Sequence, residues 1–433
     1  MRVPFEKRTL ANGLDVIVHE DHRLPMVAVS VWYHVGSRNE RPGKTGFAHL
    51  FEHLMFEGSA HQPRSFFEPL QDAGGTANGS TSADRTDYWE VVPREAARRA
   101  LWMEADRMGW MLPVLTDARF ETQRSVVINE RRQNYENKPY GMASFAIARA
   151  VYPPDHPYAW PTIGETADIE AATLEDVHAF FKRYYHPGNA SLAIGGDITA
   201  AEAFGVAEEF FAEIPAGPAV APVVPPPVVA SGANVVVEDR VDLPRVYLSW
   251  PSPPLFAAGD AELDLAADFI GYGRTSRLYK RLIHERRVAT EISASQSSRE
   301  LGGLFSIVAT AAPGIPLADV HQAVVEELNA LRSTGPDRDE MERGRAQAEA
   351  AFVYRIQSLG GFGGRVDQLN AYNMHLGEPD SFDRDLARYR DATAATVQEA
   401  FRRWIEPDRA AVVSFVPEGR QDMAALQPVA SRP

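Results

Sequence analysis

The chain has 433 residues, a formal net charge of -15 at pH 7 and no cysteine. Nucleic acid is excluded as the main partner, because its binding needs a basic surface that displaces phosphate counterions and the sequence has no basic stripe. The lack of cysteine excludes disulfides, thiol catalysis and thiolate ligands, which leaves histidine and carboxylate side chains as the strong metal ligands.

Length and hydrophobicity indicate two domains without a membrane span. A chain of this length exceeds one typical hydrophobic core. Its most apolar tract, residues 219–229, is broken by prolines and is shorter than the roughly 18 residues that cross a bilayer. No leader precedes the first predicted strand, so we expect a cytoplasmic protein, or a periplasmic one if an export signal has been removed.

The first predicted elements are two strands within Asp15–Trp32, where alternating valines flank a charged turn in DVIVHEDHRLPMVAVSVW. A similar segment, NVVVEDRVDLPRVYLSWP, occupies Asn234–Pro251, at an offset of 219 residues (234 − 15). This repeat predicts an α+β protein with two homologous domains, each a mainly antiparallel sheet covered by helices. Each domain should open with an antiparallel pair of strands.

A predicted helix follows, and its segment His49-Leu50-Phe51-Glu52-His53 has the strongest chemical signal in the chain. Residues three and four apart share one face of a helix, so His49, Glu52 and His53 should lie together. Two imidazoles and a carboxylate at this spacing are typical of a hydrolytic zinc site, with two ligands and a base that activates water. The opposite, buried face is marked by apolar residues at helical spacing, namely Phe47, Leu50, Phe51, Leu54 and Met55.

A hydrolytic zinc site usually takes a third protein ligand and leaves one position for water. Spacing alone does not select that ligand. The candidates after the motif are His61, Glu104, Asp106, Glu121, Glu130 and Glu136.

A proline-rich segment divides the chain. Residues 214–232 read IPAGPAVAPVVPPPVVASG, which is incompatible with a helix or a central strand and predicts an extended spacer. The predicted domains are residues 1–213, with the zinc site, and 233–433, without it. The offset of 219 puts Asp268, Gly271 and Tyr272 of the second half at the three motif positions.

The chain resembles the pitrilysin/insulinase family of zinc peptidases with an inverted HxxEH motif, in particular the short members that include the mitochondrial processing peptidase and its bacterial relatives. The resemblance covers both halves. It rests on HLFEH, on GGTANGSTSADRTDYW from Gly74 to Trp89, and on FETQRSVVINERRQ from Phe120 to Gln133. It implies that His49, His53 and Glu130 bind one Zn²⁺ per chain, with Glu52 as the general base.

The helix predicted around Glu130 could be capped by Thr116 or Asp117. A purely structural alternative for Glu130 is an ion pair with Arg131 or another surface cation. Relatives usually have a second glutamate at the position of Gln123, where an amide still forms hydrogen bonds but adds no charge. We therefore expect altered hydrogen bonding and charge around the zinc ligands, without loss of the site.

The resemblance also makes residues 77–82 a substrate-binding edge strand, to which a peptide adds as a further strand. Asn78 is the main candidate for a substrate contact, with Ala77 and Gly79 beside it. The alternative is a turn at Asn78-Gly79, because Asn-Gly strongly favours turns.

Complete sites of this family use an Arg and, seven residues later, a Tyr from the second half to bind the scissile carbonyl. In residues 276–294, SRLYKRLIHERRVATEISA, these positions align with Ile283 and Thr290, which cannot replace them. Since family members pair homologous chains, the resemblance implies a heterodimer in which a homologous subunit supplies the Arg/Tyr pair.

The predicted function is a zinc endopeptidase that hydrolyses peptides or unfolded segments in a chamber formed with that partner. The alternative is a non-catalytic scaffold subunit, like the respiratory-complex core proteins that share the fold. The intact HxxEH motif with Glu130 favours the enzyme, whereas the missing Arg/Tyr pair favours the scaffold.

Overall fold

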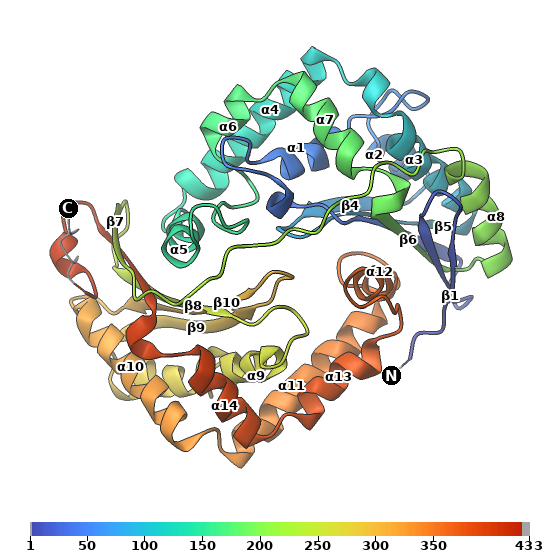
Figure 1. Ribbon diagram of the computed structural model, residues 1–433. Coiled ribbons are helices and arrows are strands. Elements are labelled where there is room, and N and C mark those ends of the chain that lie inside the picture. The colour runs from blue at the N-terminus through green and yellow to red at the C-terminus, as the bar shows by residue number, and fades with distance from the viewer. Residues whose placement is uncertain (1, 427–433) are drawn as a thin grey trace. The chain divides into compact units, whose positions relative to one another are not determined.

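Two β-sheets, one of six strands and one of five, organise the chain in the computed structural model, which describes residues 2–426 (Figure 1). Their strand orders are β1-β2-β6-β3-β5-β4 and β7-β11-β8-β10-β9. Each sheet has one parallel pairing, β2 with β6 and β7 with β11, and the other pairings are antiparallel. The predicted α+β class with two mainly antiparallel sheets is confirmed.

The first sheet belongs to unit 1 and the second to unit 2. The strands of unit 1 are β1 Glu6–Thr9, β2 Asp15–Glu20, β3 Met26–Tyr33, β4 Thr76–Thr81, β5 Thr86–Pro93 and β6 Ala190–Gly196. Those of unit 2 are β7 Asn234–Asp239, β8 Arg245–Ser252, β9 Ala289–Ser297, β10 Gly303–Ala311 and β11 Ala411–Pro417.

The helices divide between the same two units. Unit 1 has α1 Phe47–Leu54, α2 Phe67–Asp72, α3 Ala97–Trp110, α4 Asp117–Arg131, α6 Thr166–Ala171, α7 Leu174–Tyr184, α8 Ala200–Phe211 and α12 Arg365–Leu376. Unit 2 has α5 Ala143–Val151, α9 Asp260–Gly271, α10 Leu317–Thr334 and α14 Ala394–Trp404. The boundary between the units falls within α11 Arg338–Gln357 and α13 Phe382–Asp391. Of the helices in residues 2–426, none combines the length and hydrophobicity needed to span a bilayer.

The repeated segments form the expected strands, but the two strands of each repeat do not pair with each other. β6 lies between β2 and β3, and β11 lies between β7 and β8. The prediction of directly paired strands is therefore wrong. The five residues between β2 and β3 can bridge two strand spacings, about 10 Å, so a strand from much later in the chain can insert there.

The units do not follow the predicted linear domains. Arg132–Ala159, from the first half of the chain, belongs to unit 2, and Ala351–Arg384, from the second half, belongs to unit 1. The predicted linker, residues 214–232, contains no helix or strand, and the chain passes from unit 1 to unit 2 after Val223. Each unit thus includes a segment from the other half of the sequence.

In unit 1 the exchanged helix α12 covers one face of the sheet, and α1, α3 and α8 lie on the other face (Figure 1). Polar contacts fasten α12 to the strands. The amide of Asn370 donates to the Ser30 carbonyl at 2.7 Å and accepts from the Ser191 hydroxyl at 2.7 Å. The indole of Trp32 donates to Asp367 at 2.7 Å. With both faces covered, β3 is buried along nearly its whole length.

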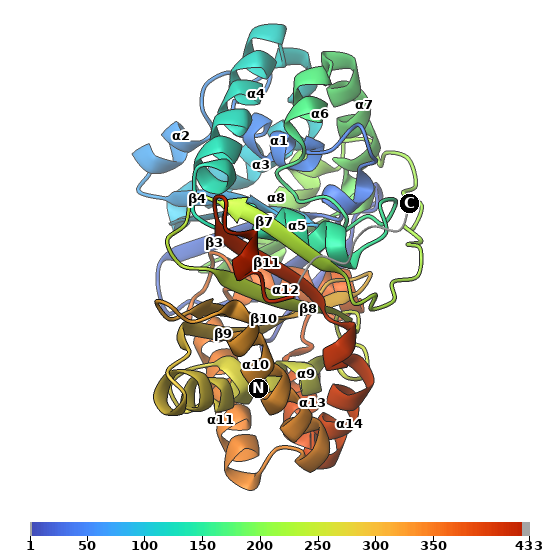
Figure 2. The ribbon, with the colours of Figure 1, turned by 90° about the vertical axis from the view of Figure 1, so that its left-hand side faces the viewer.

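In unit 2 the exchanged helix α5 covers one face of the sheet, and α9, α10 and α14 cover the other (Figure 2). Tyr140, just before α5, fastens this segment to the strands. Its amide donates to Asp239 at 2.7 Å, and its hydroxyl donates to the Leu243 carbonyl at 2.6 Å. The two sheets are therefore completed in the same way, by a helix from the opposite half of the chain.

The core of unit 1 contains a fully buried ionic cluster. Nε of Arg107 on α3 donates to Glu104 at 2.8 Å, and its NH2 lies 3.4 Å from Oε1 of Glu90 on β5. The guanidinium also lies over the rings of Phe66 and Tyr88, at 3.8 and 4.1 Å from their centres. Burial and the nearby charge of Glu104 raise the pKa of Glu90 well above its ordinary value, which favours the protonated, neutral form of this side chain.

Substitutions in this cluster should show that the charge of Arg107 is required, whereas a neutral side chain is acceptable at position 90. Arg107→Met is expected to destabilise unit 1 by about 3–5 kcal/mol, because it leaves the Glu104 carboxylate buried without a cation. Glu90→Gln should be tolerated, because burial favours the neutral form of the native side chain. Urea unfolding of both variants measures the difference, and equal losses of stability would contradict this account.

The Glu90→Gln variant also has an expected pH dependence. Native Glu90 holds its proton above the pKa of an unfolded glutamate, so its contribution to stability falls as the pH rises through that value. Glutamine does not titrate. The free energy of unfolding of Glu90→Gln relative to the wild type should therefore increase with pH, by up to about 1.4 kcal/mol per unit above about pH 4.5. A difference that stays constant between pH 5 and pH 8 would argue that Glu90 is ionised.

Candidate metal centre

Helix α1, which carries the HxxEH motif, starts at a glycine with a constrained conformation. Gly46 has φ +89°, and a Cβ there would approach the Ile163 carbonyl oxygen to 3.0 Å. Since glycine has no side chain to cap the helix, Glu40 takes this role. Its two carboxylate oxygens accept the amides of Gly46 at 2.9 Å and Ala48 at 2.8 Å. The start of the motif helix is thus held from outside the helix.

The apolar face of α1 is buried as the sequence predicts. Phe51 stacks on Tyr185 and Phe180, with ring centres 5.0 and 5.5 Å apart, and Leu50 and Leu54 are almost completely buried. This packing leaves the opposite face, with the motif side chains, directed toward α4 and β4.

Helix α4 positions Glu130 one residue before its end. The hydroxyl of Thr116 accepts the amide of Arg119 at 3.3 Å, so Thr116 caps this helix, as the sequence suggests. At the other end, the guanidinium of Arg131 donates to the Gly164 carbonyl and to the Glu165 carboxylate, each at 3.0 Å. Arg131 is thus anchored to the loop before α6.

The same loop holds the start of α1. A Cβ on Gly164 would lie 2.4 Å from the Cα of Gly46, and the amide of Glu165 donates to the Thr45 hydroxyl at 2.9 Å. The two helix ends are therefore fastened to one short segment, Ile163–Glu165.

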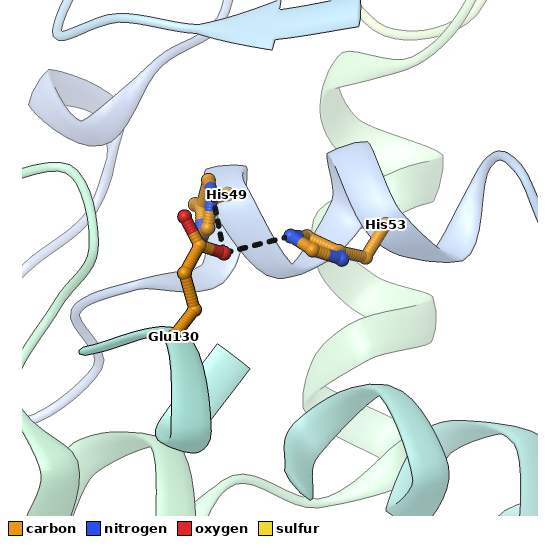
Figure 3. Close-up of side chains that lie close together, drawn as sticks. All are labelled: His49, His53 and Glu130. Atoms are coloured by element: carbon orange, nitrogen blue, oxygen red, sulfur yellow. Dashed lines mark ion pairs between the residues drawn. The ribbon is translucent and has the colours of Figure 1, made fainter. Parts of the chain in front are cut away.

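The structure brings His49, His53 and Glu130 together (Figure 3). Oε2 of Glu130 lies 3.3 Å from Nε2 of His53 and 3.7 Å from Nε2 of His49. One ligand atom from each of the three residues lies within 4.8 Å of the others. Ligands at 2.0–2.1 Å from a tetrahedral ion are about 3.3–3.4 Å apart, so this trio fits zinc with little adjustment.

The electrostatics of the trio also suit a metal. Burial and the nearby His53 lower the pKa of His49 to about 4, although Glu130 opposes this shift. His49 is therefore neutral at physiological pH, with a lone pair available for a cation. Two imidazoles and one carboxylate are the donor set of several zinc hydrolases, which keep a fourth position open.

Glu52 lies on the same helix and is held by the neighbouring edge strand. The Thr81 hydroxyl donates to Oε2 of Glu52 at 2.7 Å. Burial raises the pKa of Glu52 above its ordinary value, and the Thr81 hydrogen bond opposes this rise. A carboxyl group whose pKa moves toward neutrality and whose orientation is fixed suits proton transfer.

The other candidates for a third ligand have different partners. His61 and Asp106 bond to each other at 2.5 Å. Glu104 belongs to the buried Arg107 cluster, and Glu121 pairs with Arg124 at 3.3 Å. Glu136 belongs to unit 2.

Gln123 supports the motif helix indirectly. Its amide donates to Glu57 at 2.8 Å, and Glu57 lies four residues after His53. The side chain is buried, so this bond ties α4 to the segment that follows α1.

The predicted substrate strand is an edge strand of the first sheet. β4 spans Thr76–Thr81 and pairs only with β5 in the described sheet. The turn predicted as an alternative at Asn78-Gly79 is wrong, because both residues lie inside β4, opposite Trp89 and Tyr88. Asn78 is exposed, Ala77 is half-buried and Gly79 is buried.

The corresponding region of the second half has no such site. Asp268 and Gly271 lie on α9, and Tyr272 follows it. Within residues 2–426, a group of three potential ligands of this kind is found only at His49, His53 and Glu130. Ile283 packs against the hydrophobic core of unit 2, and the Thr290 hydroxyl contacts the Thr310 carbonyl at 3.5 Å.

Sequence reasoning missed the residues that hold the motif in place. Glu40, Gly164 and Thr81 act through contacts with α1 or with residues just before it, and their spacing in the sequence has no periodic signal. A glycine before the helix, where a capping side chain is expected, was the one available sign that a distant carboxylate caps α1.

Two models of one protein family match most of the chain. Residues 15–153 match the family model described as "Insulinase (Peptidase family M16)", and residues 171–348 match the one described as "Peptidase M16 inactive domain". The chain is 30% identical to the protein named Zinc protease PqqE from Helicobacter pylori over 361 residues, covering 82% of this chain and 80% of the relative.

Two further relatives extend the likeness over nearly the whole chain. Mitochondrial-processing peptidase subunit beta of Blastocladiella emersonii is 24% identical over 396 residues, covering 89% of this chain and 83% of the relative. The crystal structure of a protease from Helicobacter pylori superposes with a TM-score of 0.87 at 26% identity, covering 96% of this chain and 100% of that chain. The chain therefore belongs to the insulinase family of peptidases, M16, as a short member similar to the mitochondrial processing peptidase.

Proposed function

We propose that this protein is a zinc-dependent endopeptidase that cleaves extended peptides or unfolded segments. The observation that carries the proposal is the convergence of His49, His53 and Glu130 from two helices, with Glu52 on the same helix as the histidines. The named zinc proteases among the relatives support zinc as the metal.

Each residue of the site has a separate role in the proposed reaction. His49, His53 and Glu130 hold the ion, which when bound supplies Lewis-acid polarisation of the peptide carbonyl and a more acidic water. Glu52 takes a proton from the attacking water and returns it to the leaving amine, a role worth about 10²- to 10⁴-fold in rate. Thr81 keeps the Glu52 carboxylate in one orientation during both transfers.

β4 is the proposed binding strand for the substrate. An exposed strand edge offers unpaired backbone groups, and an extended peptide can pair with them regardless of its sequence. Asn78 is exposed on this edge, with Ala77 and Gly79 beside it, and Thr81 at the end of the strand touches Glu52. A peptide paired with β4 would therefore pass close to the general base.

We further propose a heterodimer with a homologous chain. Ile283 and Thr290 supply neither a cation nor a phenol where family members use Arg and Tyr, and a relative of this chain is named as a subunit of a processing peptidase. A homologous partner with the Arg/Tyr pair would complete the stabilisation of the scissile carbonyl.

The rival function is a non-catalytic scaffold, which the same missing pair favours. A scaffold has no need for a general base beside two imidazoles, so the intact site weighs against it. Zinc analysis of the purified chain separates the two functions. We expect about one zinc per chain for the enzyme, and a chain that binds none would support the scaffold.

The role of Glu52 is tested by Glu52→Gln. This variant should keep its zinc while hydrolysis of an unfolded protein such as casein falls by about 10²-fold or more. Glu68→Gln, at an exposed glutamate outside the site, is the matched control and should leave the rate unchanged. Both are assayed in whichever form of the wild type is active, alone or with a partner, and near-wild-type turnover by Glu52→Gln would reject the role.

The role of Thr81 is tested by comparing two substitutions. Thr81→Val removes the hydroxyl that bonds Glu52 and should lower kcat by about 10-fold or more, because hydrogen bonds to charged groups contribute about 1.5–3 kcal/mol. Thr81→Ser keeps the hydroxyl and should stay close to the wild type. Zinc content should be unchanged in both, and equal rates for the two variants would exclude a positioning role.

The heterodimer is tested by measuring hydrolysis by the chain alone and after addition of a homologous chain that has the Arg/Tyr pair. We expect a large gain on mixing, and a loss of that gain when the partner's Arg or Tyr is replaced. Full activity of the lone chain would contradict the heterodimer while leaving the zinc peptidase proposal intact.

A further inference from the structure

A pocket of unit 1 lies beside the start of α1 and along α7. Its volume is about 250 Å³, and none of the proposed zinc ligands lines it. Its walls combine three aromatic residues, Phe47, Phe180 and Tyr184, with three cationic ones, Arg41, Lys44 and Arg183. We call it the α7 pocket.

The aromatic residues form one side of the α7 pocket. The ring centres of Phe180 and Tyr184 are 4.8 Å apart, and those of Phe47 and Phe180 are 6.0 Å apart. Phe47 and Tyr184 are almost completely buried, whereas Phe180 is half-buried and so presents part of its ring to the pocket. Such a surface favours contact with another planar ring.

The charges of the α7 pocket do not balance within it. Asp176 pairs with Lys44 at 2.6 Å, and the Glu40 carboxylate accepts the backbone amides of Gly46 and Ala48. Both carboxylates of the pocket are therefore engaged.

Two guanidiniums remain available. Neither Arg41 nor Arg183 forms an ion pair with a carboxylate of residues 2–426, and both side chains are exposed. The Arg183 guanidinium lies 5.4 Å from the centre of the Tyr184 ring, which puts a cation beside the aromatic side of the pocket. Guanidinium groups bind phosphate oxygens in pairs of parallel hydrogen bonds, and two of them suit a dianion.

We propose that the α7 pocket binds an aromatic monophosphate, with the ring against the exposed part of Phe180 and the phosphate bound by Arg41 and Arg183. The volume supports a small ligand, since drug-sized molecules occupy about 300–1,000 Å³. Inorganic phosphate would leave the aromatic surface unused, and a neutral ring would leave both guanidiniums unpaired. Ligand binding in this pocket would need no zinc, so a test of this proposal can fail or succeed independently of the proposed peptidase activity.

The position of the α7 pocket relates it to the motif helix. Phe47 is the first residue of α1, and Glu40 caps that helix. A ligand in the pocket would therefore contact the end of α1 that the cap and Gly46 hold in place.

Isothermal titration calorimetry of the 433-residue chain with phenyl phosphate tests the proposal. We expect phenyl phosphate to bind at least 10-fold more tightly than inorganic phosphate or phenol, because only phenyl phosphate uses both surfaces. Equal affinities for phenyl phosphate and inorganic phosphate, or no binding of phenyl phosphate, would overturn the proposal.

Substitutions locate the binding site. Arg41→Glu and Arg183→Glu should each weaken phenyl phosphate binding at least 10-fold, and Phe180→Ala should weaken it while leaving the affinity for inorganic phosphate unchanged. Arg384→Glu, a charge reversal at an exposed arginine outside the pocket, is the matched control and should bind like the wild type. Circular dichroism verifies that each variant is folded. Wild-type affinity in both folded pocket arginine variants would place any binding elsewhere and overturn the proposal.

Discussion

The close contact between Gly46 and Gly164 is the constraint on which the candidate metal centre depends. The motif helix α1 and the helix α4, which bears Glu130, are far apart in the sequence. The start of α1 and the end of α4 both contact the segment Ile163–Glu165. A side chain on either glycine would push the start of α1 away from this segment, as the 2.4 Å approach of a Cβ on Gly164 to the Cα of Gly46 shows. Because zinc ligands tolerate only a few tenths of an ångström of error, this contact matters for the proposed site by fixing the start of α1 and the end of α4 to one segment.

The exchange of helices explains why the two halves of the sequence are not two independent proteins. The first sheet buries one face under α12, which follows the second sheet's first four strands in the chain. Asn370 and Asp367 satisfy polar groups of the strands that would otherwise be buried without partners. The site therefore lies on a scaffold whose packing draws on both halves of the sequence, although every proposed zinc ligand comes from the first.

Features set by local chemistry could be predicted from the sequence. The motif helix follows from its 3.6-residue apolar period, the start of α4 from Thr116, and the repeat strands from their alternating valines. Features that depend on distant segments could not. The insertion of β6 between β2 and β3 prevents the direct pairing of these two strands that their proximity in the sequence favours. The pairing of β4 with β5 overrides the turn preference of Asn78-Gly79. The partner of Gln123 and the cap of α1 likewise come from elsewhere in the chain.

The exchanged helix α12 has a consequence for synthesis on the ribosome. β6, which along the chain is the last strand of the first sheet, ends at Gly196. Helix α12 ends at Leu376, 180 residues later (376 − 196). At about 5–20 residues per second, the nascent sheet waits about 10–40 s with one face uncovered. During that time Trp32 and its neighbours are open to chaperones and to wrong association with other emerging chains. The rate at which the second half of the chain is translated should therefore affect how much of the first half reaches its native fold.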